Sequence, residues 1–406
     1  SGQTYVEPGR VIAAYQGVGK GMMIATATDS LLLNWEKHPA NPVIPNEVSG
    51  VFSAKGNNLR RILDNCIWKE KNGFYYALSG SYRNGRRGRK GNCIGETLIF
   101  RSKYLKKWEY LGPMYTDTVF AEPGEDMQVP NFWPIDHNKH MLLCFSHKHA
   151  GRGYVGTFDL KTARFKADYH FRENHGSYAN ASLHAPTATI DEQGRYIGIF
   201  NTKEAKGISH DGWDGIFTLP RVYSLAEDNS IRINPIDEMK SLRFDHKSLA
   251  AHDIKTDNEE VLKGIVGRSM EIKVILNPGN SEETGINVLR SADGKEFTRI
   301  GYSADGKIFI DRKKSSLHKN IENRDIELAP LNLKPGELLE FSIFIDQSIV
   351  EVFANGKLTL TKRVYPTKKS SGTVSLYSKG GRARLESFDA WQMRSVWPEL
   401  KYKEGK

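Results

Sequence analysis

The sequence lacks the features that mark membrane-spanning, disulfide-linked and metal-binding chains. None of its 406 residues lies in a run approaching the ~20 consecutive apolar residues of a transmembrane helix, so we expect no membrane span. Its three cysteines, Cys66, Cys93 and Cys144, form no Cys-x-x-Cys pair, which argues against a disulfide scaffold or a zinc site. The first residues also lack the basic-then-apolar layout of a signal peptide. We expect neither a metal nor a cofactor.

Helical periodicity is almost absent as well. Instead, short runs rich in Val, Ile, Tyr, Phe and Thr recur and are closed by Gly, Asn or Asp, which is typical of β-strands. Examples are residues 10–17, 21–29, 73–82, 139–147 and 195–202. The sequence therefore predicts an all-β chain, and its length is ample for two cores.

The chain is basic, with a formal net charge of +10. Its densest basic stretch is RNGRRGRK (83–90), which is interrupted by glycine and lies between two strand-like runs. Nucleic-acid binding would require interleaved aromatic residues or a recognition helix, and neither is present here. We interpret the stretch as a solvated loop and expect no nucleic-acid partner.

One motif that occurs twice in the sequence indicates blades of a β-propeller. LLNWEKHPANPVIP (32–45) and LKKWEYLGPM (105–114) share the pattern Leu-x-x-Trp-Glu, with Trp35 and Trp108 lying 73 residues apart. A Trp repeated at the end of a strand hairpin with such a period is typical of propeller repeats. We expect a propeller domain at 1–245.

From Ser269 the strands lengthen and alternate cleanly, as in 270–277, 338–356 and 372–378. Alternation with one polar face predicts a two-sheet sandwich at 269–406. Residues 246–268 are interpreted as a linker that is partly helical.

Three stretches resemble glycoside hydrolase family 32, the invertase and fructanase family: LLNWEKHPANPVIP, DGWDGIFTLPRVYSL (211–225) and FSIFIDQSIVEVFANGK (341–357). The resemblance implies a five-bladed propeller followed by a β-sandwich. It also implies retaining hydrolysis of β-fructosides or related furanosides, with three acids in the propeller funnel. We expect an oligo- or polysaccharide substrate and a secreted or periplasmic rather than cytoplasmic location.

The family's transition-state-binding Asp lies in an Arg-Asp-Pro motif, which here reads Leu63-Asp64-Asn65. Only the Asp is kept. The resemblance implies that Asp64 accepts hydrogen bonds from sugar hydroxyls. The alternative is a turn residue that opens a strand.

The family's acid/base Glu lies in Trp-Glu-Cys-Pro-Asp, and alignment on the proline puts Gln128 at the Glu position. Two acids lie upstream, and the resemblance to a divergent branch favours Glu125 first and Asp126 second as replacements. In an extended segment Asp126 and Gln128 share a face, so strand geometry leaves the choice open. The alternative is that both acids solvate a loop.

The nucleophile motif, Asn-Asp-Pro-x-Gly, occurs nowhere in the sequence. At about 60 residues per blade, residues 1–245 hold about four blades, whereas the family has five. We therefore expect the first blade to be missing from this chain, either cut off or supplied by another chain.

Other candidates belong to the walls of the cleft. Phe132 and Trp133 could stack on a sugar ring, or could be core aromatics, while Gln128, His147 and His184 could hydrogen-bond hydroxyl groups. The reading that competes with an enzyme is a non-catalytic propeller that binds carbohydrate, which Gln128 and the absent nucleophile motif favour.

Overall fold

The computed structural model describes residues 2–46, 62–176, 183–209, 212–321 and 325–397. Ser1 at the start of the predicted propeller domain and Asp211 at the start of the stretch 211–225 lie outside these ranges. Strands dominate, and the one helix that is assigned in the described part is the short 3₁₀ helix η1 (Asp237–Leu242). The all-β prediction is confirmed. In the described ranges no helix is long and apolar enough to cross a membrane.

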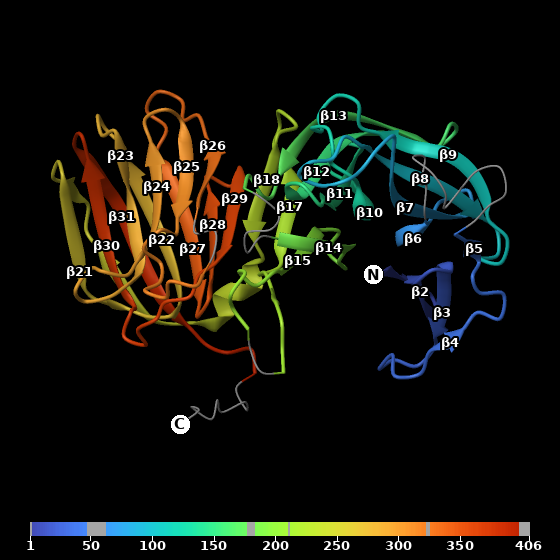
Figure 1. Ribbon diagram of the computed structural model, residues 1–406, viewed down its shortest axis with the longest axis horizontal. Helices are drawn as coiled ribbons and strands as arrows, with labels where there is room; N and C mark the ends of the chain where they lie inside the picture. Colours follow the sequence, from blue (N-terminus) through green and yellow to red (C-terminus); the bar gives the residue numbers. More distant parts are fainter. Residues whose placement is uncertain (1, 47–61, 177–182, 210–211, 322–324, 398–406) are drawn as a thin grey trace. The chain divides into compact units, whose positions relative to one another are not determined.

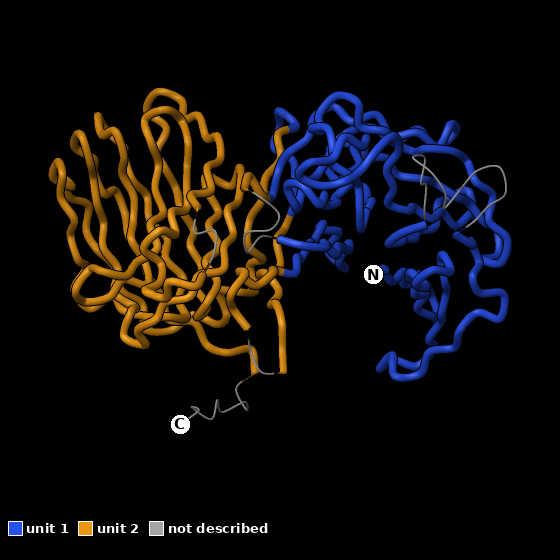
Figure 2. Tube along the Cα trace, viewed as in Figure 1, with its two compact units in different colours: residues 1–173, 183–201, 223–229 blue, residues 174–182, 202–222, 230–406 orange. Residues whose placement is uncertain are grey.

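The chain divides into two compact units (Figure 2). The first comprises residues 1–173, 183–201 and 223–229, and the second comprises residues 174–182, 202–222 and 230–406.

The N-terminal half of the chain is built from sheets whose consecutive strands pair, as in propeller blades (Figure 1). The first contains β1 (Gly2–Glu7), β2 (Arg10–Gly17), β3 (Gly21–Ala27), β4 (Glu36–Lys37) and β5 (Ile44–Pro45). The second contains β6 (Leu63–Lys69), β7 (Tyr75–Arg83), β8 (Ile94–Ser102) and β9 (Glu109–Thr116). The third contains β10 (Gln128–Ile135), β11 (Lys139–Ser146), β12 (Ala150–Asp159) and β13 (Arg164–Arg172). The fourth contains β14 (Leu183–Ile190), β15 (Tyr196–Thr202), β16 (Ile216–Phe217), β17 (Arg221–Leu225) and β18 (Ile231–Pro235). These four sheets agree with the count of about four blades.

The repeated Leu-x-x-Trp-Glu motif forms the same turn in the first two sheets. The indole of Trp35 donates a hydrogen bond to the carbonyl of Leu32 at 2.8 Å, and that of Trp108 donates to the carbonyl of Leu105 at 3.0 Å. Both leucines have positive φ, 53° and 66°. In each sheet the turn leads into the fourth strand, so the shared pattern is a structural repeat.

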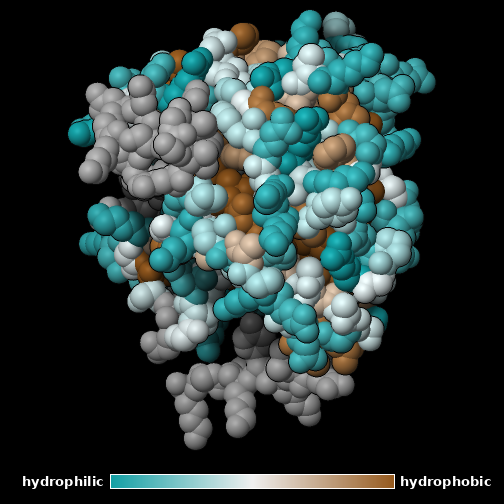
Figure 3. Space-filling model, turned by 90° about the vertical axis from the view of Figure 1, so that its right-hand side faces the viewer, coloured by the Kyte–Doolittle hydropathy of each residue, from teal (hydrophilic) through white to brown (hydrophobic). Residues whose placement is uncertain are grey.

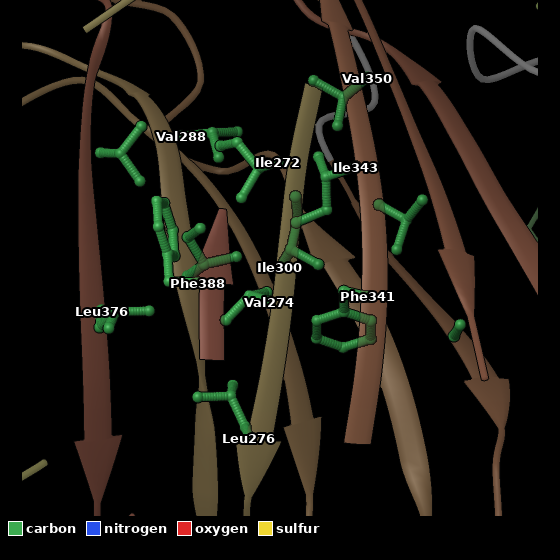
Figure 4. Close-up of a cluster of buried hydrophobic side chains, with 14 of the residues drawn as sticks. Ile272, Val274, Leu276, Val288, Ile300, Phe341, Ile343, Val350, Leu376 and Phe388 are labelled. Atoms are coloured by element: carbon green, nitrogen blue, oxygen red, sulfur yellow. The ribbon is translucent and has the colours of Figure 1, made fainter. Parts of the chain in front are cut away.

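The C-terminal part forms two sheets around one apolar core. One sheet has the order β19 (Arg243–Leu249), β31 (Ala383–Met393), β22 (Ser269–Asn277), β27 (Leu339–Asp346), β28 (Ile349–Ala354), β29 (Leu358–Arg363), and β20 (His252–Ile254) also pairs with β31. The other has the order β21 (Asn258–Val266), β30 (Thr373–Lys379), β23 (Glu283–Arg290), β24 (Thr298–Ser303), β25 (Lys307–Asp311), β26 (Ile326–Pro330). Inward-facing residues of both sheets, such as Ile272, Ile300 and Phe341, are at most 1% exposed (Figure 4). The predicted two-sheet sandwich is thereby confirmed.

The prediction of a partly helical linker at 246–268 is wrong. The segment contains β20, β21 and most of β19, which pair with β31 and β30. Because β19 and β21 lie at sheet edges and most of their side chains are exposed, they lack the alternating apolar pattern that identifies an inner strand.

Figure 3 shows one face of the molecule, on which hydrophobic side chains are interrupted by hydrophilic ones. Apolar atoms scattered in this way are ordinary for a protein surface and need no partner to explain them.

Candidate active site

Three neighbouring strands of the first unit, β6, β10 and β14, begin with the same backbone irregularity. Strand β10 contacts both β6 and β14. The pairing register of β6 shifts at Asp64 and that of β10 shifts just after Gln128. Positive φ values occur at Asp64 (46°), Val129 (47°) and Ala185 (44°), a conformation that non-glycine residues adopt at a cost. Such bulges re-aim side chains, and they mark the starts of these three strands as a candidate site.

Asp64 and Gln128 begin adjacent strands at this place. Leu63 pairs with Gly80, and a Cβ atom added to Gly80 would lie 2.5 Å from the carbonyl oxygen of Met127 and 3.0 Å from the Cα of Gln128. Asp64 is half-buried, and its carboxylate has no hydrogen-bond or ion-pair partner in the described part of the chain. It is therefore available to a ligand's hydroxyl groups.

Gln128 is 2% exposed, and its Nε2 donates to the carbonyl of Met127 at 3.1 Å. A side-chain amide does not titrate at ordinary pH, so Gln128 cannot act as a general acid.

Glu125 is fully buried in a ring of donors. Arg172 donates to both of its oxygens, at 2.9 and 3.0 Å, and Arg152 lies 3.1 Å from Oε2. Ser146 and the backbone N–H of Glu122 donate to the same carboxylate. Burial alone would raise the pKa of Glu125, but the charge of Arg152 and the hydrogen bonds of Arg172 outweigh it and lower this pKa to about 2. Glu125 therefore has the surroundings of a structural ion-pair residue that stays deprotonated.

Asp126 is also buried, but it is connected to a partly exposed side chain. It accepts hydrogen bonds from the backbone N–H of His147 and from the ring Nδ1, each at 2.8 Å, while Arg87 lies 3.5 Å away. A carboxylate acceptor at Nδ1 places the hydrogen on that nitrogen. The side chain of His147 is 26% exposed, so Asp126 fixes the ring of a residue that reaches the surface.

Phe145 brings the two predicted histidines together and was missed by the sequence analysis. It pairs with Gln128 in the ladder between β10 and β11. Its ring centroid lies 5.0 Å from that of His147 and 4.9 Å from that of His184, which belongs to β14. Gln128, His147 and His184 therefore gather around one buried aromatic ring. The sequence offered no signal for Phe145, because it ends an ordinary apolar strand.

Phe132 and Trp133 have different surroundings from those of a sugar-stacking platform. Phe132 is 1% exposed and packs against Trp68, Phe158 and other rings, as a core residue does. The indole of Trp133 donates to the carbonyl of Ala188 at 3.3 Å, linking β10 to β14. Of the predicted wall residues, the structure brings Gln128, His147 and His184 together and leaves these two aromatics apart from them.

No group of three or more His, Cys, Asp or Glu side chains arranged to hold a metal ion occurs in the described ranges.

Comparison with known proteins identifies relatives over nearly the whole chain. Residues 1–235 match the model for the N-terminal domain of glycosyl hydrolases family 32, and residues 238–392 match the model for the family's C-terminal domain. A levanase of Bacillus subtilis is 26% identical over 388 residues, which is 89% of this chain and 53% of the levanase. A sucrose-6-phosphate hydrolase of Escherichia coli is 24% identical, over 86% of this chain and 70% of that protein.

The fold agrees with solved structures. The crystal structure of fructan 1-exohydrolase IIa from Cichorium intybus superposes with a TM-score of 0.79 at 18% identity, covering 97% of this chain and 83% of that one. At this identity the likeness speaks for the fold alone. The chain spans about half the length of the Bacillus subtilis levanase.

Proposed function

The chain belongs to glycosyl hydrolase family 32, and from that premise we propose that it is a glycosidase that cleaves β-fructosides or related furanosides. The names of its relatives, a levanase and a sucrose-6-phosphate hydrolase, support this substrate class. The observation that carries the proposal is the half-buried Asp64 at the β6 bulge, whose carboxylate has no partner in the described part of the chain. We propose a retaining mechanism and a secreted or periplasmic location.

In the mechanism, Asp64 binds two sugar hydroxyls and stabilises the oxocarbenium-like transition state. No residue of this sequence is proposed as the nucleophile, because the family's Asn-Asp-Pro-x-Gly motif does not occur in it.

For the proton donor we favour His147, held by Asp126, over Glu125. Both oxygens of Glu125 are held by arginines, and a carboxyl with a pKa of about 2 holds no proton to give at neutral pH. Asp126 instead contacts the partly exposed His147. Imidazolium is a competent general acid near neutral pH, so His147 is the group that passes the proton and Asp126 is its positioning residue.

A second candidate function is carbohydrate binding without cleavage, and Gln128 is the observation that favours it. Incubation of the full-length gene product with sucrose, levan, inulin and arabinofuranosides distinguishes the two, with fructose or arabinose release as the readout. Release supports the hydrolase. Calorimetric binding of the same sugars without release supports the binding protein.

A further inference from the structure

Asp64 lies in an irregular piece of strand that needs support. The ladder between β6 and β7 pairs Leu63 with Gly80 and then Asn65 with Ser79. Asp64 is therefore an extra residue with no partner on β7, and its φ of 46° is costly for a residue other than glycine. Such a bulge interrupts the ladder hydrogen bonds, so it persists only where neighbouring groups replace them.

The hydroxyl group of Ser79 supplies these replacements. Its oxygen accepts a hydrogen bond from the N–H of Leu63 at 2.8 Å, and the hydroxyl donates to the carbonyl oxygen of the same residue at 3.0 Å. The carbonyl oxygen of Gly80, at 3.3 Å, is a longer alternative acceptor. Ser79 is fully buried. One side chain thus satisfies both backbone groups of the residue that precedes Asp64.

Ser79 can act as a support because its own strand is fixed on the far side. A Cβ atom added to Gly80 would lie 2.5 Å from the carbonyl oxygen of Met127, and the N–H of Met127 donates to the carbonyl of Ser81 at 3.3 Å. Strand β7 is therefore held against the segment that leads into β10. A change of the Ser79 side chain should consequently move β6 and Asp64 rather than β7.

The bulge of β10 is held in a similar way. Asn131 is 2% exposed, and its Nδ2 donates at 3.1 Å to the carbonyl of Val129, which lies within the register shift and has a φ of 47°. The same amide donates to the carbonyl of Pro186 at 3.2 Å, and its oxygen accepts from the N–H of Ala188 at 2.9 Å. A buried polar side chain on the backbone of a bulge therefore occurs at both strands.

We propose that Ser79 is the positioning residue of Asp64, because its hydroxyl fixes the bulge that aims this carboxylate at the sugar. The inference rests on the proposed function, which gives Asp64 its role at the transition state. Ser79 itself acts only through the backbone of Leu63. Misplacing a catalytic group by ~1 Å can lower a rate on the order of 10²-fold, so the loss of one hydroxyl is enough to reveal the role.

The test is a double-mutant cycle in the full-length protein, with sucrose and levan as substrates. Ser79→Ala should lower kcat about 10- to 100-fold and leave KM within about threefold, because Asp64 acts on the transition state. In the Asp64→Asn background the same change should alter kcat by less than about twofold, because no carboxylate remains to be aimed.

Ser81→Ala is the matched control. Ser81 lies two residues further along β7 and is 1% exposed, and its Oγ has no hydrogen-bond partner in the described ranges. This variant should keep kcat for both sugars within about twofold of the wild type, because it breaks no hydrogen bond. If Ser79→Ala does not fold, Ser79→Cys takes its place, because a thiol has a similar size and hydrogen-bonds only weakly.

A loss of the same size in the wild-type and Asp64→Asn backgrounds overturns the inference, as does an equal loss in Ser81→Ala. If the wild type releases no sugar, the proposed hydrolase fails, and crystal structures of the two serine variants decide the inference separately. The expected result is that Asp64 leaves its left-handed conformation and β6 changes its register in Ser79→Ala only. An unchanged bulge in Ser79→Ala overturns the inference.

Discussion

Asp126 accepts two hydrogen bonds from His147, one from its backbone N–H and one from its ring, and both measure 2.8 Å. The carboxylate is buried while the histidine is partly exposed. The buried carboxylate of Asp126 thus fixes the orientation of the partly exposed imidazole ring of His147. That relationship is the basis of the first prediction.

Replacing His147 by Ala is predicted to lower kcat for sucrose about 10²- to 10⁴-fold, because a general acid contributes on this scale. An aryl fructoside, whose leaving group needs little protonation, should lose much less. Asp126→Asn, which weakens the hold on the ring of His147, should also lower kcat for sucrose more than kcat for the aryl fructoside. His137→Ala, which changes a histidine in the turn between β10 and β11, serves as the control and should retain activity. Equal losses of kcat for sucrose and for the aryl fructoside in His147→Ala would contradict the role of His147 as proton donor.

Glu125→Gln is predicted to destabilise the first unit by about 3–5 kcal/mol, because it leaves the buried charges of Arg152 and Arg172 without their partner. Chemical denaturation measures this loss. If Glu125 were instead a catalytic acid, Glu125→Gln would lower the activity and leave the free energy of unfolding unchanged.

The same ion pairs predict how stability depends on pH. The pKa of Glu125 is about 2 in the folded protein and 4.5 in its ordinary state, so its contribution is fully present above pH 4.5. The contribution should be lost as pH falls from 4.5 towards 2. Glu125→Gln should show a flatter decline of the free energy of unfolding over this interval, and identical slopes for both proteins would contradict the assignment.

Gln128→Glu is predicted to raise fructose release at least about tenfold. The side chain of Gln128 is 2% exposed and has no cationic hydrogen-bond partner among the described residues, so burial is expected to raise the pKa of a carboxyl placed there and to keep it protonated as an acid. Gln128→Asn keeps an amide and should give no gain. No change in either variant would mean that position 128 takes no part in proton transfer.

The sequence predicted the features that local patterns encode. Strand runs, the Leu-x-x-Trp turn and the inward alternation in the sandwich all follow from the nearest neighbours of each residue, and the structure confirms them. The edge strands β19 and β21 were not predicted. Their strand conformation depends on pairing with β31 and β30 and is not marked by a pattern in their own sequence.

The candidate site was only partly predictable for a related reason. Asp64 and Gln128 were proposed from motifs, and His147 and His184 from their places near strand ends. Phe145 and the arginines around Glu125 come close to them only through the pairing of strands. Of the two roles left open for Phe132, stacking on a sugar required an exposed ring, and the exposure of this ring is set by aromatic side chains of other strands.

The most direct test of the account is fructose release from sucrose and levan by the full-length protein and by its Asp64→Asn variant. The account predicts release by the wild type, a loss of at least about 100-fold in kcat for the variant, and an unchanged unfolding midpoint. The midpoint should be unchanged because the carboxylate of Asp64 has no partner in the described part of the chain. No release by the wild type, or equal release by both proteins, would contradict it.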